Sequence, residues 1–263
     1  MADVVANGVR LHVQRIGRSA ADGAQPVVFL HGLVMDNLSS FYFTLANPIA
    51  ERADAILYDL RGHGLSERPA HGYRVATLVA DLAALLDALD VYRPVDIVGN
   101  SFGGLLALAF AAAHPARVRR LALIDAHTGT DGWAAQMTAT LGLRGDARDA
   151  KIAESFQSWL GRHSERKRTR LAQSAEALVE GTSLVADLRE SPPLAADDLR
   201  TIACPVLALY GEKSDVRANG EALAAALPSC TLELLPGCTH SVLWEATATV
   251  RDRISAFVGG AAP

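Results

Sequence analysis

A short glycine-rich turn between a β-type run and a helical run constrains the fold of this chain most strongly. The turn, GNSFGG at residues 99–104, contains the pattern G-x-S-x-G around Ser101, with apolar runs on both sides at 95–98 and 105–113. Small residues two positions before and after the serine let strand and helix approach closely, and the strained turn pushes the hydroxyl clear of the sheet. The pattern predicts an α/β unit with a nucleophilic serine. A phosphate-binding turn is the alternative, but the further glycines and the lysine of a phosphate loop are missing.

Composition excludes several classes of protein. Half of the 263 residues are hydrophobic, enough for one large α/β domain or for a core with an insertion. The net charge of -4 argues against nucleic-acid binding, and no apolar run reaches the roughly 18 residues of a membrane span. The N-terminus shows no secretory signal. Three scattered cysteines, Cys204, Cys230 and Cys238, favour reduced thiols in the cytoplasm over a disulfide framework, and no cluster has metal-ligand spacing.

Short β-type runs alternate with helical patterns along the chain. Apolar residues recur at three-and-four spacing over 75–89, and 221–227 and 246–257 also read as helices. This alternation predicts a mostly parallel sheet with helices on both faces, and the later β-type runs are almost entirely apolar, as strands covered on both faces should be. The β-type runs are 9–16, 26–30, 55–58, 95–98, 121–124, 206–210 and 232–235.

One segment interrupts the alternation. From Thr128 to about Ile202 the sequence contains helical patterns and no convincing strand. We therefore expect an α/β core formed by residues 1–127 and 203–263, and a helical cap or lid formed by residues 128–202. Ligands of open α/β sheets bind at the carboxyl edge of the strands, so this cap would form a wall of the binding pocket.

A serine hydroxyl needs an adjacent base, which is most often a histidine oriented by a carboxylate. His240 lies in a turn just after the last β-type run, where the sheet edge is expected, and we predict that it is the base. In this architecture the acid lies between the serine and the histidine along the chain. We favour Asp215, in the loop after residues 206–210; Glu212 in the same loop and Asp125, at the end of the strand after the elbow, remain alternatives.

Acyl transfer also requires two N–H groups aimed at the oxyanion that develops during the reaction. One comes from the residue after the nucleophile, which is Phe102, and the other from the loop that follows the strand at 26–30. We expect Leu33 to supply the second N–H group. Gly32 permits the tight turn, and His31 orders the loop through hydrogen bonds.

The motifs, taken in chain order, resemble those of the α/β-hydrolase superfamily over nearly the whole chain. The resemblance implies an eight-stranded, mostly parallel sheet with a helical cap insertion, and serine chemistry that needs no cofactor or metal. The elbow, with Asn100 before the nucleophile, resembles that of meta-cleavage-product C–C hydrolases, whereas the loop HGLVMD departs from the glycine-rich sequence of those enzymes. The motifs that carry the resemblance are HG at 31–32, DLRGHGLS at 59–66, GNSFGG at 99–104, GEKSD at 211–215 and CTH at 238–240.

We expect hydrolysis of a carboxylic ester or thioester through an acyl-enzyme. Three alternatives stay open: C–C bond hydrolysis of a vinylogous diketone, an editing thioesterase beside a multi-domain synthase, and a ligand receptor on a hydrolase scaffold. The expected ligand is a small apolar acyl substrate. A basic run at 162–170 fits docking of an acidic acyl carrier protein, or else a solvated helix face. Candidates for the pocket lining, each of which has a place in the core as its alternative, are Val34, Met35, Trp133, Met137, Trp159 and Val242.

Overall fold

The computed structural model of the protein describes residues 2–18, 23–143, 145, 147 and 165–258. Within these residues, eight strands form one sheet in the order β1-β2-β4-β3-β5-β6-β7-β8. Strand β2 pairs antiparallel with β1 and β4, and every other pair is parallel, which confirms the predicted sheet. The strands are β1 (Ala2–Ala6), β2 (Val9–Gly17), β3 (Gln25–Leu30), β4 (Ala53–Tyr58), β5 (Val95–Asn100), β6 (Val118–Ile124), β7 (Val206–Gly211) and β8 (Cys230–Leu235).

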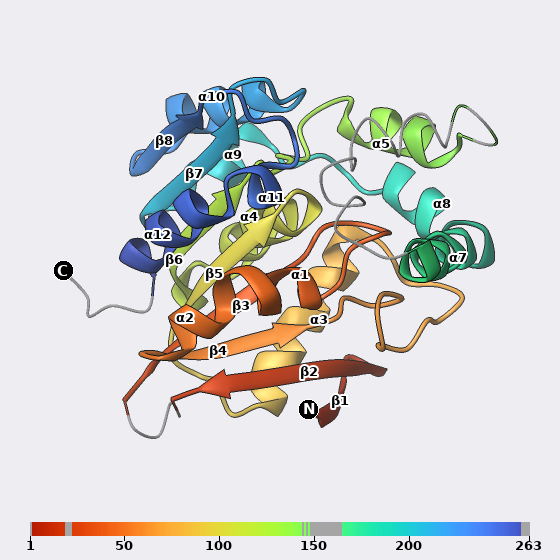
Figure 1. Cartoon of the computed structure of the whole chain (residues 1–263), viewed down its shortest axis with the longest axis horizontal. Helices are drawn as coiled ribbons and strands as arrows, with labels where there is room; N and C mark the ends of the chain where they lie inside the picture. The colour runs from red at the N-terminus through yellow and green to blue at the C-terminus, as the bar shows by residue number, and fades with distance from the viewer. Residues whose placement is uncertain (1, 19–22, 144, 146, 148–164, 259–263) are drawn as a thin grey trace.

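Helices cover both faces of the sheet (Figure 1). The central strands are mostly apolar because alternate side chains enter different cores: in β3, Val28 and Leu30 belong to one core, and Val27 and Phe29 to the other. The first core is completed by α3 (Val75–Ala88), α4 (Phe102–Ala113) and α10 (Arg217–Ala226); the second by α1 (Ser39–Phe41), η2 (Tyr42–Ala46), α2 (Asn47–Ala50), α11 (Val242–Glu245) and α12 (Thr247–Phe257).

The described residues between β6 and β7 contain helices and no strand. Figure 1 shows three of them, α5, α7 and α8, grouped beyond the carboxyl end of the parallel strands. We call these three the cap helices. Asp187 of α8 accepts the backbone N–H of Tyr73 at 2.8 Å, and the Arg68 guanidinium donates to the hydroxyl of Ser174 in α7 at 2.8 Å, so the loop before α3 anchors α7 and α8. The helices are α5 (Trp133–Leu141), α7 (Glu165–Gly181), α8 (Leu184–Arg189) and α9 (Ala196–Arg200).

The strand register brings distant parts of the chain to one edge. Asn100 is paired with Ile124, and Ile124 with Leu209, so the segments that leave β5, β6 and β7 start side by side. The N–H of Ser101 donates to the carbonyl of Ile124 at 2.9 Å, and the N–H of Asp125 donates to that of Leu209 at 2.8 Å. No helix among the described residues is both long and apolar enough to cross a membrane.

Candidate active site

Ser101 lies at the apex of the turn between β5 and α4 with φ 53° and ψ -115°, in a region that non-glycine residues rarely occupy. The turn is this tight because the chain has no Cβ atoms where strand and helix meet. A Cβ at Gly99 would lie 2.6 Å from the carbonyl oxygen of Gly103, and a Cβ at Gly103 would lie 1.9 Å from that of Leu30. The close packing of strand and helix therefore stabilises the unfavourable backbone conformation of Ser101, as is common at functional sites.

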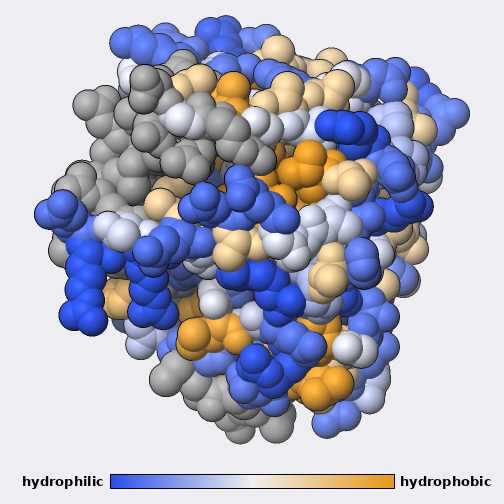
Figure 2. Space-filling view, turned by 90° about the vertical axis from the view of Figure 1, so that its right-hand side faces the viewer, coloured by the Kyte–Doolittle hydropathy of each residue, from blue (hydrophilic) through white to orange (hydrophobic). Residues whose placement is uncertain are grey.

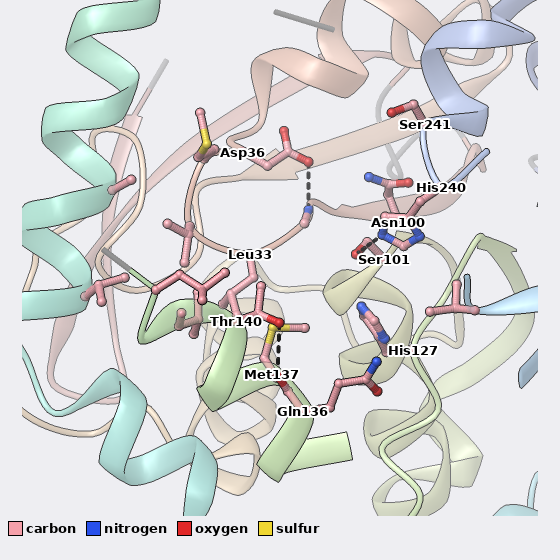
Figure 3. Close-up of a pocket in the computed structure, with 18 of the residues that line it drawn as sticks. Leu33, Asp36, Asn100, Ser101, His127, Gln136, Met137, Thr140, His240 and Ser241 are labelled. Atoms are coloured by element: carbon pink, nitrogen blue, oxygen red, sulfur yellow. Dashed lines mark hydrogen bonds between the residues drawn. The ribbon is translucent and has the colours of Figure 1, made fainter. Parts of the chain in front are cut away.

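The elbow presents the Ser101 hydroxyl to His240 (Figure 3). Ser101 Oγ lies 3.0 Å from His240 Nε2, and His240 Nδ1 lies 2.6 Å from Asp125 Oδ2. A carboxylate only accepts, so Nδ1 carries the proton and Nε2 is left to accept the serine hydroxyl proton. The three side chains are connected in the same order as the nucleophile, base and acid of a serine hydrolase.

Asp125 occupies the position beside His240 that the sequence suggested for Asp215. The Asp125 side chain is fully buried and also accepts the N–H of Gly211 at 2.7 Å and the hydroxyl of Ser214 at 2.5 Å. Asp215 Oδ1 lies 3.9 Å from His240 Nδ1, beyond hydrogen-bond distance, and its side chain is 61% exposed. The difference arises because the loop after β7 turns Ser214 inward, while the backbone of Asp125, with φ 45°, follows β6 directly at the sheet edge.

The loop after β3, where the sequence predicts one oxyanion donor, is tightly turned. Val34 has φ 65°, and the N–H of Met35 donates to the carbonyl of Leu33 at 2.9 Å, which makes a three-residue turn of the strained kind. Leu33 lines the pocket, and Phe102 begins α4, where backbone N–H groups lack helical partners. Among the described residues, neither the Leu33 N–H nor the Phe102 N–H has a hydrogen-bond partner, so both are available to a ligand.

Two histidines position this loop through hydrogen bonds. His31 makes hydrogen bonds with the carbonyl of Gly32 at 2.7 Å and the N–H of Leu60 at 3.0 Å, as predicted for an ordering residue. His63 was not predicted: it accepts the N–H of Val34 at 2.8 Å and donates from Nδ1 to a backbone carbonyl at 2.9 Å. Burial lowers the pKa of His63 to about 3, so it stays an uncharged acceptor at neutral pH. One sequence signal could have pointed to His63. It lies in the glycine-rich loop after β4, and β4 is the neighbour of β3 in the sheet, so the loops after the two strands lie close together.

A pocket of about 280 Å³ opens over Ser101 and His240 beneath the cap helices. Figure 2 views this face and shows hydrophobic residues recessed among hydrophilic ones. Val242 does not line this pocket: its neighbours Ser241 and Leu243 do, whereas Val242 is fully buried in the core on the α12 side of the sheet. Trp159 lies outside the described residues. Of the predicted lining residues, those that line the pocket are Val34, Met35, Trp133 and Met137.

The charges around the pocket are one-sided. The acidic residues Asp36, Glu176, Glu180 and Asp215 line it, and none of the described lining residues is a lysine or an arginine. Among the described lining residues, therefore, no cationic side chain could pair with a carboxylate of a bound ligand. The arrangement suits a substrate that is apolar or uncharged.

Comparison with known proteins agrees with the fold. A family model described as alpha/beta hydrolase fold matches residues 25–203. A 2-hydroxy-6-oxo-2,4-heptadienoate hydrolase of Pseudomonas putida is 40% identical over 126 residues, which are 47% of this chain and 43% of that relative, so the chain aligns with under half of that relative's length. Serine hydrolase BPHL of Mus musculus is 25% identical over 254 residues, 92% of this chain and 80% of that protein. A solved structure of the meta-cleavage product hydrolase CumD from Pseudomonas fluorescens IP01 superposes with a TM-score of 0.81 at 22% identity, over 98% of this chain and 97% of that one.

Proposed function

This chain belongs to the alpha/beta hydrolase fold family, and we propose that it hydrolyses a carboxylic ester or thioester through an acyl-enzyme. The observation that carries the proposal is the hydrogen-bonded series from Ser101 through His240 to Asp125, at the floor of a pocket whose described lining has no cationic side chain.

In the proposed reaction, Ser101 Oγ attacks the carbonyl carbon of the substrate while His240 Nε2 accepts the hydroxyl proton. The carbonyl oxygen becomes an oxyanion and receives hydrogen bonds from the N–H groups of Leu33 and Phe102. When the tetrahedral intermediate collapses, His240 returns the proton to the leaving oxygen or sulfur. His240 then deprotonates a water that attacks the acyl-enzyme, and the acid product leaves with Ser101 restored.

We assign the role of the acid to Asp125. Its contact with His240 Nδ1 holds the imidazole in the tautomer that leaves Nε2 free to accept a proton, and its negative charge stabilises the imidazolium that forms. The hydrogen bonds from Gly211 and Ser214 support this role, since they fix the orientation of the carboxylate.

C–C bond hydrolysis is the second candidate, because the names of two of the relatives describe such substrates: a hydroxy-oxo-heptadienoate and meta-cleavage products. A dienoate carries a carboxylate, which a buried site normally pairs with a cationic group. The described lining of this pocket offers four acidic residues, Asp36, Glu176, Glu180 and Asp215, and no lysine or arginine. Ester or thioester hydrolysis therefore takes precedence.

The nucleophile is tested by labelling with a fluorescent fluorophosphonate. We expect the wild-type protein to be labelled and Ser101→Ala and His240→Ala to stay unlabelled. Turnover is then compared between p-nitrophenyl esters, acyl thioesters and a 2-hydroxy-6-oxo-dienoate. Hydrolysis of the dienoate without hydrolysis of either acyl substrate would replace our proposal with C–C hydrolysis, and binding without turnover of any of them would favour a receptor.

Several finer expectations remain predictions from the sequence. They are the lid role of residues 128–202, an editing thioesterase function, an acyl carrier protein as partner and a cytoplasmic location. The basic run at 162–170 bears on the carrier protein, and its first residues lie outside those that the structure describes.

A further inference from the structure

A second histidine, His127, faces the pocket beside the candidate catalytic residues. Its backbone N–H donates to the carbonyl of Ser101 at 3.1 Å, which ties it to the nucleophile elbow. Its ring lies with centroid distances of 5.5 Å to the ring of His240 and 5.9 Å to that of Trp133. His127 lines the pocket, and Figure 3 shows it below Ser101, with Leu33 to the left. The proposed catalytic steps make no use of this imidazole.

Nothing in the described part of the chain forms a hydrogen bond with either ring nitrogen of His127. Burial, followed by the nearby charge of His240, lowers the pKa of His127 to about 3. The ring is therefore neutral at pH 7 and offers one donor and one acceptor. The side chain of His127 is half-buried and lines the pocket, so a ligand there would take the place of water at its ring nitrogens. A ligand in the pocket is the partner that this geometry provides for.

We infer that His127 forms a polar subsite that binds an uncharged oxygen group on the alcohol part of the ester. The inference rests on the proposed ester hydrolysis, because it places the leaving oxygen within hydrogen-bond reach of His240 Nε2. The ring of His127 lies beside the ring of His240, so a hydroxyl or carbonyl two to three bonds beyond the leaving oxygen can reach it. The apolar wall formed by Val34, Met35 and Met137 then remains for the acyl chain.

The chemistry of the subsite limits what it accepts. A neutral imidazole pairs well with a hydroxyl, which also has one donor and can accept, or with a carbonyl oxygen. An anionic group would lie near the carboxylate of Asp215, which acts on His127, with no lysine or arginine in the described lining. The substrate class is thus a carboxylic ester with an apolar acyl chain and an alcohol that carries a second, uncharged oxygen.

Two butyrate esters of nearly equal size test the subsite: 2-hydroxyethyl butyrate and propyl butyrate. In the wild-type protein we expect kcat/KM to be about tenfold higher for the hydroxyethyl ester, the factor that one buried hydrogen bond provides. In His127→Phe the ratio should fall to near 1, and in His127→Gln it should stay in between. Because the acyl group is shared, any effect of a variant on the common chemistry cancels in this ratio. His71→Gln, an exposed histidine away from the pocket, should keep the wild-type ratio.

Thermal unfolding without substrate is the second measurement. His127→Phe removes a half-buried side chain whose ring nitrogens have no hydrogen-bond partner among the described residues, so its Tm should stay close to that of the wild type, whereas a histidine with a structural partner would lower it when replaced. A wild-type ratio near 1, or a ratio that His127→Phe leaves unchanged, would overturn the subsite. If neither ester is hydrolysed and the fluorophosphonate labels nothing, the proposed function itself fails; hydrolysis of both esters at equal rates defeats the subsite alone.

Discussion

Three donors converge on the carboxylate of Asp125: the N–H of Gly211, the hydroxyl of Ser214 and Nδ1 of His240. Hydrogen bonds that a carboxylate accepts are stronger than those between neutral groups. Asp215 approaches the same imidazole from the exposed side, where water screens its charge. Because Asp125 is buried and in direct contact with Nδ1, it fixes the tautomer of His240 more strongly than Asp215 does.

Replacement of each acid by its amide should separate the two. Asp125→Asn leaves the shape of the site but no longer favours a proton on Nδ1, so kcat for an ester should fall by about 10³–10⁴-fold. Asp215→Asn should lower kcat by less than about tenfold, since only a screened charge is lost. Steady-state kinetics with p-nitrophenyl butyrate measures both, and a larger loss in Asp215→Asn would reverse the assignment.

The sequence led directly to Ser101 and His240 as candidates, because an elbow motif and a histidine after the last strand are local signals. The acid is a different case. Asp125 and Asp215 each follow an apolar strand, and the choice depends on which residue of the loop after β7 turns inward. A shift of one position in that loop brings Ser214 to the site, and no residue pattern encodes such a shift.

His63 is expected to act on the reaction through Val34. Its Nε2 accepts the Val34 N–H at 2.8 Å and so holds a β-branched residue at φ 65°, next to the predicted oxyanion donor Leu33. His63→Phe removes the acceptor, so the loop relaxes and kcat should fall by about 10²-fold with KM little changed. His63→Gln offers a carbonyl oxygen to Val34 and should recover part of kcat. Equal kcat values in the two variants would show that the contact does not position the loop.

Among the elements, those predicted best are the strands of the parallel sheet, because an apolar run bounded by turns is a strong pattern. The β-type runs at 26–30 and 206–210 match β3 and β7 to within one residue at each end. Strand β1 was implied only by the family resemblance and not identified from its own residues. Asn7 and Gly8, both with positive φ, form the turn between β1 and β2, and an Asn-Gly pair is a hairpin signal that the sequence does contain.

The close contact of β5, α4 and β3 leaves no space for a side chain at Gly103. Gly103→Ala should destabilise the protein by more than about 3 kcal/mol or prevent folding, because its Cβ would lie 1.9 Å from the carbonyl oxygen of Leu30 and backbone would have to move. Gly181→Ala is the matched control: it ends α7, and a Cβ there meets nothing within 4 Å. Urea unfolding of both variants is the measurement. A Gly103→Ala protein as stable as Gly181→Ala would contradict the packing described for the elbow.

On the scale of the whole molecule, the pocket forms where the cap helices pack against the edge of the sheet. The sequence predicts how these helices dock less well than it predicts the strands. Met35 of the oxyanion loop packs against Ala175 of α7, and Trp133 of α5 stacks on Phe102 at 5.9 Å. These contacts join residues far apart in the chain, so they depend on how the helices dock. Val242 shows the consequence: its hydrophobicity fits a pocket and a core equally well, and only the direction of α11 decides between them.

Buried neutral histidines also make the stability of the whole molecule depend on pH. In the unfolded chain His63 titrates with a pKa near 6.5, and in the folded protein burial lowers that pKa to about 3. Between these values the unfolded state binds more protons, so the free energy of unfolding rises with pH and is lost as the pH falls from 6.5 toward 3. In the folded protein the pKa of Asp187 is lowered from 3.8, so protonation of Asp187 reduces the free energy of unfolding only at lower pH. Between pH 7 and pH 5 we therefore attribute the change in the free energy of unfolding to the histidines.

The size of this effect can be measured by comparing His63→Gln with the wild type. At pH 5 a histidine with these two pKa values costs the folded state roughly 2 kcal/mol relative to pH 7. Glutamine does not titrate, so the loss of unfolding free energy between pH 7 and pH 5 should be smaller in His63→Gln by about that amount, whatever its stability at pH 7. His71→Gln removes an exposed histidine and should leave the wild-type pH dependence intact. If all three proteins lost stability equally over this window, His63 would have to titrate normally in the folded state, and it could not then remain an uncharged acceptor for Val34.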